Sequence, residues 1–256
     1  MILVRLIRLN EWIDKIWLFF IAFIFLQTIL GSKYLYKEFL VMIIFLFFSF
    51  SFTFLINSYK ERDIDKVVGK DRAMLKVTEK FVILLIIIFG LISFFIPFYF
   101  NNMYITALNI FILLLAYFYS TKPLYLKSCP ISGVVVAGMI QGPLAYMFFL
   151  FIAPDYITQI LFITLWILVI NIYMQLIHQI IDYKNDIITN MNTLAVKINK
   201  HNTIILSYFF MALMIFFLVL PFYLINNFYI AAFGSLLFLL YYLPSFACHP
   251  SFKVFE

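Results

Sequence analysis

Residues 39–65 read FLVMIIFLFFSFSFTFLINSYKERDID, and the order of residue types in this stretch predicts the fold of the chain. Residues 39–56 contain no charged side chain, and about 20 mostly apolar residues are enough for an α-helix to cross a bilayer. Asn57 ends the apolar run, and Glu61, Asp63 and Asp65 follow at once. The stretch therefore predicts a membrane-spanning helix with a group of acidic residues at its end.

The rest of the chain repeats this pattern. Hydrophobic residues make up 66% of the 256 residues and charged residues only 12%, whereas about a quarter of a soluble domain is charged. This composition predicts an all-α, polytopic transmembrane bundle that forms a single integral-membrane domain over residues 1–256. In the fifth predicted span, Gly138 and Gly142 predict close helix packing. Apolar runs between polar breaks predict eight spans: 14–31, 39–57, 80–99, 103–120, 131–152, 157–179, 202–225 and 228–246.

The basic residues predict how the chain is oriented. With a cytoplasmic N-terminus, Lys33 and Lys37 fall on the outer side, and the other 16 of the 18 Lys and Arg residues fall inside. This distribution follows the positive-inside rule and predicts a plasma-membrane protein with both termini in the cytoplasm. It also explains the net charge without a nucleic-acid partner. Residues 2–13 place apolar residues opposite Arg5, Arg8 and Asn10, which predicts a short amphipathic helix at the membrane interface.

The acidic residues form two short segments on the predicted cytoplasmic side. Asn57, Glu61 and Asp65 are spaced by four, so they share one helix face if the second span continues through them. Asp182 and Asp186 repeat this spacing at the end of the sixth span. Carboxylates on one face repel each other unless a cation lies between them, and Mg²⁺ suits such a site when a phosphate completes its shell. A simpler interpretation is that both segments only mark the membrane boundary.

Cationic side chains lie next to these acids in the sequence. They are Arg62, Lys66, Lys70 and Arg72 after the first acidic segment, and Lys122 and Lys127 in the loop after the fourth span. Cations beside a Mg²⁺ site suit a diphosphate, because they stabilise a departing phosphate. Each of them also fits the positive-inside rule alone.

Three motifs in these loops resemble those of the UbiA-type prenyltransferase superfamily. Asn57 to Asp65 is similar to its Asn-Asp-x-x-Asp-x-x-x-Asp motif, Asp182 to Asp186 to its Asp-x-x-x-Asp motif, and Tyr119 to Lys127 to its Tyr-Ser-x-x-Pro-x-Arg-Leu-Lys element. The chain differs from the family pattern at four positions: Ser58 and Glu61 replace Asp, Tyr125 replaces Arg, and Gln179 replaces an acid or amide. The family usually has nine spans, so eight would make this chain a shortened relative.

The resemblance implies a cavity that opens to the cytoplasmic side, where Mg²⁺ assists transfer of a prenyl group from a polyprenyl diphosphate to a small, usually aromatic acceptor within the lipid membrane. The implied Mg²⁺ ligands are Asn57, Glu61, Asp65, Asp182 and Asp186. The implied diphosphate-binding residues are Arg62, Lys66, Lys122 and Lys127. The implied catalytic residues are Asp65, Asp182 and Tyr119. Two alternatives stay open: an inactive homologue that binds a lipid or a partner subunit, and a transporter, which the absence of mid-span acids and bases disfavours.

Overall fold

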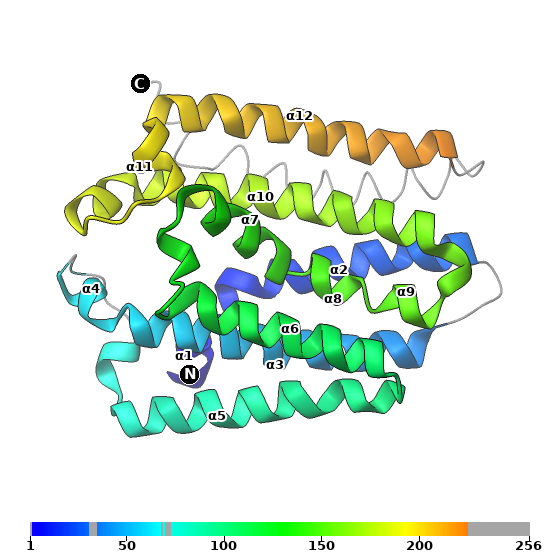
Figure 1. Cartoon of the computed structure of the whole chain (residues 1–256), viewed down its shortest axis with the longest axis horizontal. Coiled ribbons are helices and arrows are strands. Elements are labelled where there is room, and N and C mark those ends of the chain that lie inside the picture. Colours follow the sequence, from blue (N-terminus) through cyan, green and yellow to red (C-terminus); the bar gives the residue numbers. More distant parts are fainter. Residues whose placement is uncertain (1, 31–34, 68, 70–72, 225–256) are drawn as a thin grey trace.

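The computed structural model describes residues 2–30, 35–67, 69 and 73–224, and its regular elements are all helical (Figure 1). In this part of the chain, five helices are long and apolar enough to cross a membrane, and a bent pair makes a sixth. The prediction of a polytopic helical bundle is confirmed. The last predicted span, 228–246, lies outside the described residues. The five segments are α3 (Tyr36–Lys60), α5 with η2 (Glu79–Phe100), α6 (Met103–Ser120), η4 with α10 (Pro154–Ile188) and α12 (Lys200–Leu224).

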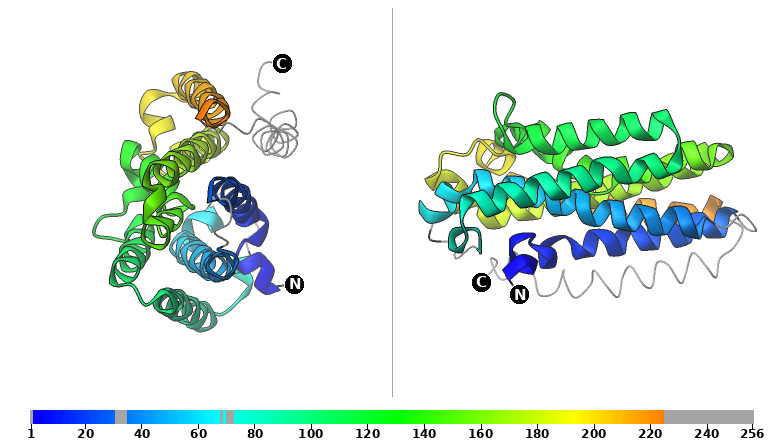
Figure 2. Two further views of the ribbon diagram at one scale, coloured as in Figure 1. Left: turned by 90° about the vertical axis from the view of Figure 1, so that its right-hand side faces the viewer. Right: turned by 90° about the horizontal axis from the view of Figure 1, so that it is seen from below.

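The long helices run side by side, so the loops gather at the two ends of the bundle (Figures 1 and 2). One end carries α4 (Arg62–Val67), the start of α7 (Pro130–Ile140) and α11 (Leu194–Ile198). The short N-terminal helix α1 (Ile2–Leu6) lies at this end too. Both acidic segments are therefore at the same end of the molecule, which is called the acidic end below.

Helix α10 (Ile157–Ile188) is central and packs against α2 (Leu9–Leu30), α7, α11 and α12. Within its most apolar window 72% of the residues are buried, against 22% for α5. A helix that is apolar all round is buried among other helices or faces lipid. The contrast therefore places α10 in the interior and leaves exposed apolar residues of α5, such as Leu84, Ile88 and Leu91, on the surface available to lipid.

The N-terminal segment differs from the predicted interfacial helix over residues 2–13. Arg8 takes a left-handed conformation with φ 54°, which ends α1 and starts α2 at Leu9. The fully buried Trp12 fixes this turn, because its Nε1 donates a hydrogen bond to the Ile7 carbonyl at 2.6 Å. The prediction of one continuous helix was wrong, and residues 9–13 extend the helix that covers the first predicted span.

The fifth predicted span is broken. Its residues form α7, α8 (Pro143–Tyr146) and α9 (Phe149–Ile152), with a bend of 42° between α7 and α8–α9. Gly142 has φ 134°, which side-chain-bearing residues rarely adopt, and Pro143 cannot continue the hydrogen bonding of α7. Asn171 Nδ2 donates to the freed carbonyl of Gln141 at 3.0 Å. One straight helix over 131–152 was therefore a wrong prediction.

The two glycines of this span have different roles. A Cβ on Gly138 would lie 3.0 Å from Ile172 Cγ1 of α10, so the predicted close packing is confirmed at that position. Gly142 instead permits the break.

Candidate functional site

Asn57, Glu61 and Asp65 stay on one helix face, although a junction between two helices lies among them. Helix α3 ends at Lys60 and α4 begins at Arg62, yet Glu61 N donates to Asn57 O at 3.0 Å and Asp65 N donates to Glu61 O at 2.8 Å. These i→i−4 bonds keep the helical path, so Asn57, Glu61 and Asp65 stay on one face. Asn57 Nδ2 also donates to Glu61 Oε2 at 3.0 Å.

The second acidic pair lies on a longer helix than predicted. Helix α10 runs to Ile188, nine residues past the predicted end at 179, and carries both Asp182 and Asp186. Asn185 Nδ2 donates to Asp182 Oδ1 at 3.4 Å, and Thr193 Oγ1 donates to Asp186 Oδ2 at 2.9 Å. The segment that carries Thr193 is in turn held to α10, because Ala195 N donates to Gln179 Oε1 at 3.2 Å. Thr193 and Gln179 therefore orient the pair.

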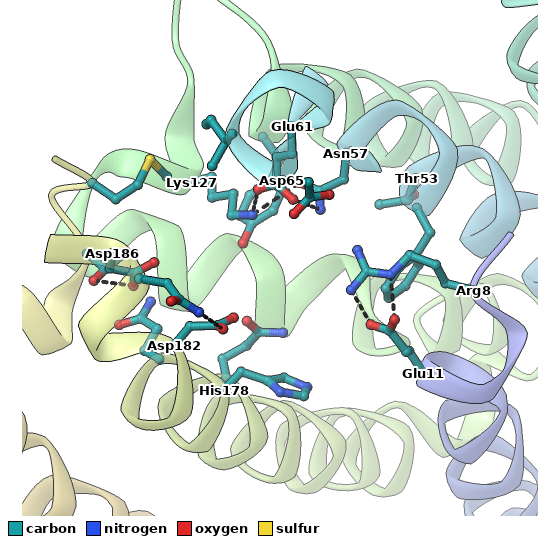
Figure 3. Close-up of a pocket in the computed structure, with 18 of the residues that line it drawn as sticks. Arg8, Glu11, Thr53, Asn57, Glu61, Asp65, Lys127, His178, Asp182 and Asp186 are labelled. Atoms are coloured by element: carbon teal, nitrogen blue, oxygen red, sulfur yellow. Dashed lines mark hydrogen bonds and ion pairs between the residues drawn. The ribbon is translucent and has the colours of Figure 1, made fainter. Parts of the chain in front are cut away.

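Both acidic sets line one cavity of about 350 Å³ at the acidic end of the bundle. Figure 3 shows Asn57, Glu61 and Asp65 on one wall and Asp182 and Asp186 on the wall that faces it. Asp65 is buried, and the other four side chains are half-buried. These six lining residues, Asn57, Glu61, Asp65, Lys127, Asp182 and Asp186, are called the acidic side of the cavity.

Lys127 is the cation that the structure places on this side. Its Nζ forms an ion pair with Glu61 and lies 3.4 Å from Asn57 Oδ1. Burial lowers the pKa of Lys127 to about 8, and the charge of Arg8 acts in the same direction, while Asp186 and Asp182 oppose it. A pKa near 8 leaves the amine mostly protonated at neutral pH, so it offsets part of the negative charge around it.

Gly133 fixes the position of Lys127. A Cβ on Gly133 would lie 2.9 Å from the Lys127 carbonyl oxygen and 3.0 Å from that of Leu126. Only a residue without a side chain lets α7 approach the loop this closely. The loop backbone is further held by bonds from Ser128 N to Tyr125 O and from Cys129 N to Leu126 O, each 3.0 Å.

The other predicted diphosphate-binding cations lie away from the cavity wall. Arg62 Nη2 donates to the Val77 carbonyl at 3.3 Å. Lys66 pairs with Asp63 and its side chain is 55% exposed. Lys122 is exposed as well. None of these three cations is among the residues that line the described cavity, and Lys70 and Arg72 lie outside the described residues.

Two aromatic residues of the third motif have different surroundings. Tyr119 lines the cavity, and the adjacent Ser120 donates from Oγ to Asn57 Oδ1 at 3.1 Å. Tyr125, with φ 38°, donates from its hydroxyl to Met191 Sδ at 3.5 Å. Burial and then the charge of Asp186 raise the pKa of Tyr125, which keeps its hydroxyl protonated at neutral pH. Ser120 was quoted in the motif, but its contact with Asn57 was not predicted.

A second set of residues lines the same cavity and was not among the predicted site residues: Arg8, Glu11, Lys15, Gln141, Gln175 and His178, called the Lys15 side of the cavity. Arg8 donates two hydrogen bonds to the Glu11 carboxylate, and its guanidinium carbon lies 5.2 Å from the centroid of the Phe54 ring (Figure 3). Lys15 lies within the first predicted span. It stands at the start of that span and was counted among the cytoplasmic cations that the positive-inside rule explains, so its place in the cavity wall was not predicted.

The donor set of the acidic side fits a hard divalent cation. Its described residues supply four carboxylates and one amide oxygen against a single cation, Lys127. No three acidic, His or Cys side chains of the described chain converge closely enough to hold a metal ion unaided. Mg²⁺ is commonly held by one or two carboxylates together with substrate phosphates. The ammonium of Lys127 already occupies a cation position between Glu61 and Asn57.

Comparisons with known proteins agree with this architecture. The model of the UbiA prenyltransferase family matches residues 16–249. None of the curated proteins matches the chain. Two structures of a UbiA homolog from Archaeoglobus fulgidus, one bound to DMAPP and Mg²⁺ and the other to GPP and Mg²⁺, each have a TM-score of 0.69 and 16% sequence identity to this chain. Each match covers 96% of this chain, and it covers 86% of the first structure's chain and 87% of the second's. A structure of digeranylgeranylglyceryl phosphate synthase has a TM-score of 0.65 at 17% identity and covers 87% of this chain and 77% of its own.

Proposed function

The chain belongs to the UbiA prenyltransferase family, and we propose that it transfers a prenyl group from a prenyl diphosphate to a small acceptor within the membrane. The observation that supports this proposal is the meeting of two acidic sets, from α3–α4 and from α10, across one cavity. The family is a transferase family, and its solved relative from Archaeoglobus fulgidus binds DMAPP or GPP together with Mg²⁺.

In this proposal the acidic side would bind Mg²⁺ together with the phosphates of the substrate, and the candidate ligands are Asn57, Glu61, Asp65, Asp182 and Asp186. The donor set suits the ion because all five side chains offer oxygen. Bound Mg²⁺ would supply charge stabilisation for the departing diphosphate. Thr193 keeps Asp186 turned toward the cavity, and Ser120 does the same for Asn57.

The chain's own residues account for the remaining steps. Lys127 donates a charged hydrogen bond to the diphosphate as the carbon–oxygen bond breaks and its electron pair leaves with oxygen. The face of Tyr119, which lines the cavity, stabilises the positive charge that develops on the prenyl carbon. The acceptor, which we propose to be an aromatic compound, then gives the electron pair of the new bond and loses the proton of the attacked ring carbon to water.

The alternative of an inactive homologue depends on Ser58 and Glu61, the two residues that replace Asp of the family pattern in the first motif. Ser58 is buried in α3 and is not among the lining residues, so its change from Asp removes no group from the described cavity wall. Glu61 keeps a carboxylate on that wall. Both observations favour a working enzyme over a decayed one.

The test is release of diphosphate from geranyl diphosphate by the purified protein with Mg²⁺ and a panel of aromatic and phosphate acceptors. Asp182→Ala and Asp186→Ala should each lower the rate at least about a hundredfold, as losing a bridging cation would. Asp155→Ala is the matched control, because Asp155 is exposed in η4 (Pro154–Tyr156), directly before α10, whereas Asp182 and Asp186 lie near the other end of that helix. Equal losses in all three variants would indicate general destabilisation. No release by the wild type with any acceptor would support the inactive homologue.

A further inference from the structure

We propose that a groove on the outer surface of the bundle binds one anionic phospholipid, with an acyl chain between α5 and α6 and the phosphate beside Lys60. None of the described residues lines both this groove and the cavity of the two acidic sets. The inference therefore goes beyond the proposed function and does not depend on it.

The groove lies between α5 and α6, and residues of α3 also line it. Asn109 Nδ2 of α6 donates to the carbonyls of Ser93 and Phe94 at 3.3 and 3.1 Å, which ties the end of α5 to α6. Figure 1 shows α5 and α6 close together near this tie and well apart at the acidic end. The groove is therefore narrow near Phe94 and open at the acidic end.

The lining is polar only at the open end of the groove. Nine of the twelve lining residues are Gly, Ile, Leu or Phe, and the other three are Tyr59, Lys60 and Tyr117. Tyr59 and Lys60 end α3, and Tyr117 lies three residues before the end of α6, so all three are at the acidic end. Tyrosine is enriched where lipid tails meet headgroups, and lysine places its ammonium there. This pattern matches a phospholipid whose tail lies in the apolar part.

The width of the groove suits a hydrocarbon chain. Its lining on α5 runs from Ile83 to Phe94, which is about 16 Å along the helix axis. The hollow of about 500 Å³ has a mean cross-section of about 30 Å² over that length. A helix with its side chains is about 10 Å across and needs more than twice that section. An extended acyl chain is therefore a better occupant than a helix of another protein.

Gly90 gives the groove part of its depth. A Cβ at this position would lie 2.9 Å from Phe52 Cε2, so the absence of a side chain lets the Phe52 ring lie against α5. Glycine weakens the interior of a helix, and this close approach explains its presence in α5. Any larger side chain at residue 90 would fill space that the groove now leaves open.

Lys60 supplies the charge that selects the headgroup. It is exposed, and among the described residues it has a cation–π contact with the Tyr59 ring at 5.5 Å and no ion pair. Glu79, at the start of α5, already accepts a hydrogen bond from the Tyr59 hydroxyl, and the exposed Lys80 follows it. Lipid tails are as apolar as leucine, so the apolar lining does not choose among lipids. Lysine near a headgroup attracts anionic lipids, so the choice rests on Lys60.

The experiment counts the lipids bound to the purified protein in detergent by native mass spectrometry, during separate titrations with dioleoyl phosphatidylglycerol and dioleoyl phosphatidylcholine. Lys60→Met removes the charge and keeps the apolar stem, and Lys197→Met is its control at an exposed lysine of α11 outside the groove. Ile87→Trp fills the groove from α5, and Ile88→Trp is its control at an adjacent exposed residue that does not line it. Geranylgeranyl diphosphate with Mg²⁺ is titrated in parallel.

The wild type should bind its first phosphatidylglycerol about fivefold more tightly than its first phosphatidylcholine, the effect of about 1 kcal/mol for one lysine near an anionic headgroup. Lys60→Met should remove this preference, whereas Lys197→Met should keep it. Ile87→Trp should weaken binding of the first lipid of either kind, and Ile88→Trp should leave it unchanged. Affinity for geranylgeranyl diphosphate should be the same in the wild type and in both Trp variants.

Equal affinity of the wild type for the two lipids would overturn the inference, and this comparison does not require any variant to fold. Tight binding of the first lipid that persists in Ile87→Trp would overturn it too. A wild-type dimer that becomes a monomer in Ile87→Trp alone would assign the groove to a second copy of the chain. Loss of geranylgeranyl diphosphate affinity in Ile87→Trp alone would assign it to the prenyl tail, and either result would refute the phospholipid.

Discussion

Replacing Lys127 or Lys122 with Met tests which lysine of this loop binds the diphosphate. Both were predicted to do so, but only Lys127 lines the cavity, where it pairs with Glu61 and contacts Asn57. Lys122 is exposed. Lys127→Met removes one charged hydrogen bond to the diphosphate, worth about 1.5–3 kcal/mol. At about 1.4 kcal/mol per factor of ten, kcat/KM for geranyl diphosphate should fall about ten- to 150-fold. Lys122→Met should change it less than about twofold.

Thermal unfolding of the same two variants is a second, independent test. Without Lys127 the half-buried Glu61 loses its cation, so the metal-free protein should unfold at a lower temperature than the wild type, and Mg²⁺ with geranyl diphosphate should restore much of the difference. The assay is diphosphate release over a range of geranyl diphosphate concentrations, together with thermal unfolding in detergent. Equal losses of kcat/KM in the two variants, or an unchanged kcat/KM in Lys127→Met, would refute the assignment of Lys127 to the diphosphate.

Two further substitutions test how the acidic side is built. Glu61→Asp should lower kcat/KM for geranyl diphosphate about tenfold, because the shorter arm cannot keep both its bond from Asn57 and its ion pair with Lys127; Glu61→Ala should lower it further, and a faster Glu61→Asp enzyme would show that the site is not adapted to Glu. Gly133→Ala should displace the Lys127 backbone, which a Cβ would approach to 2.9 Å, and should cost about 1–3 kcal/mol of stability. It should also weaken geranyl diphosphate binding by calorimetry, and wild-type affinity in Gly133→Ala would mean that this close approach does not position Lys127.

The acidic side could be predicted from the sequence because the spacing of its residues along each helix decides which face they share. Asn57, Glu61 and Asp65 follow helical spacing, and Asp182 and Asp186 do the same, so each set shares a face wherever its helix continues. Both helices do continue, through the α3–α4 junction and to Ile188. Loops that alternate between the two ends of a bundle then bring the sets to the same end (Figure 1).

The choice among the cations could not be predicted because it depends on tertiary contacts. The close approach of α7 at Gly133 holds the Lys127 backbone in place, whereas Lys122 is exposed. Arg62 turns to the Val77 carbonyl, which no local pattern indicates. Arg8 was assigned to an interfacial helix, but the turn fixed by the buried Trp12 places it in the cavity wall.

The sequence did indicate the break in the fifth span, because Gly142 followed by Pro143 is typical of a turn or a helix break. Residues 131–152 contain no charged side chain, however, so hydropathy alone predicts one helix through them. The compensating contact comes from Asn171 on another helix, whose amide satisfies the Gln141 carbonyl. Because that contact is long-range, it is visible only in the folded chain.

The central claim, that the two acidic sets hold a diphosphate through Mg²⁺, is tested most directly by titrating the purified wild type with geranyl diphosphate in the presence of Mg²⁺ and again in the presence of a chelator. Isothermal calorimetry reports binding without requiring the acceptor. The account predicts binding that needs Mg²⁺ and that weakens at least about tenfold when the ion is removed, because the acidic side would otherwise repel the diphosphate. Equal affinity with and without Mg²⁺, or no binding under either condition, would contradict it.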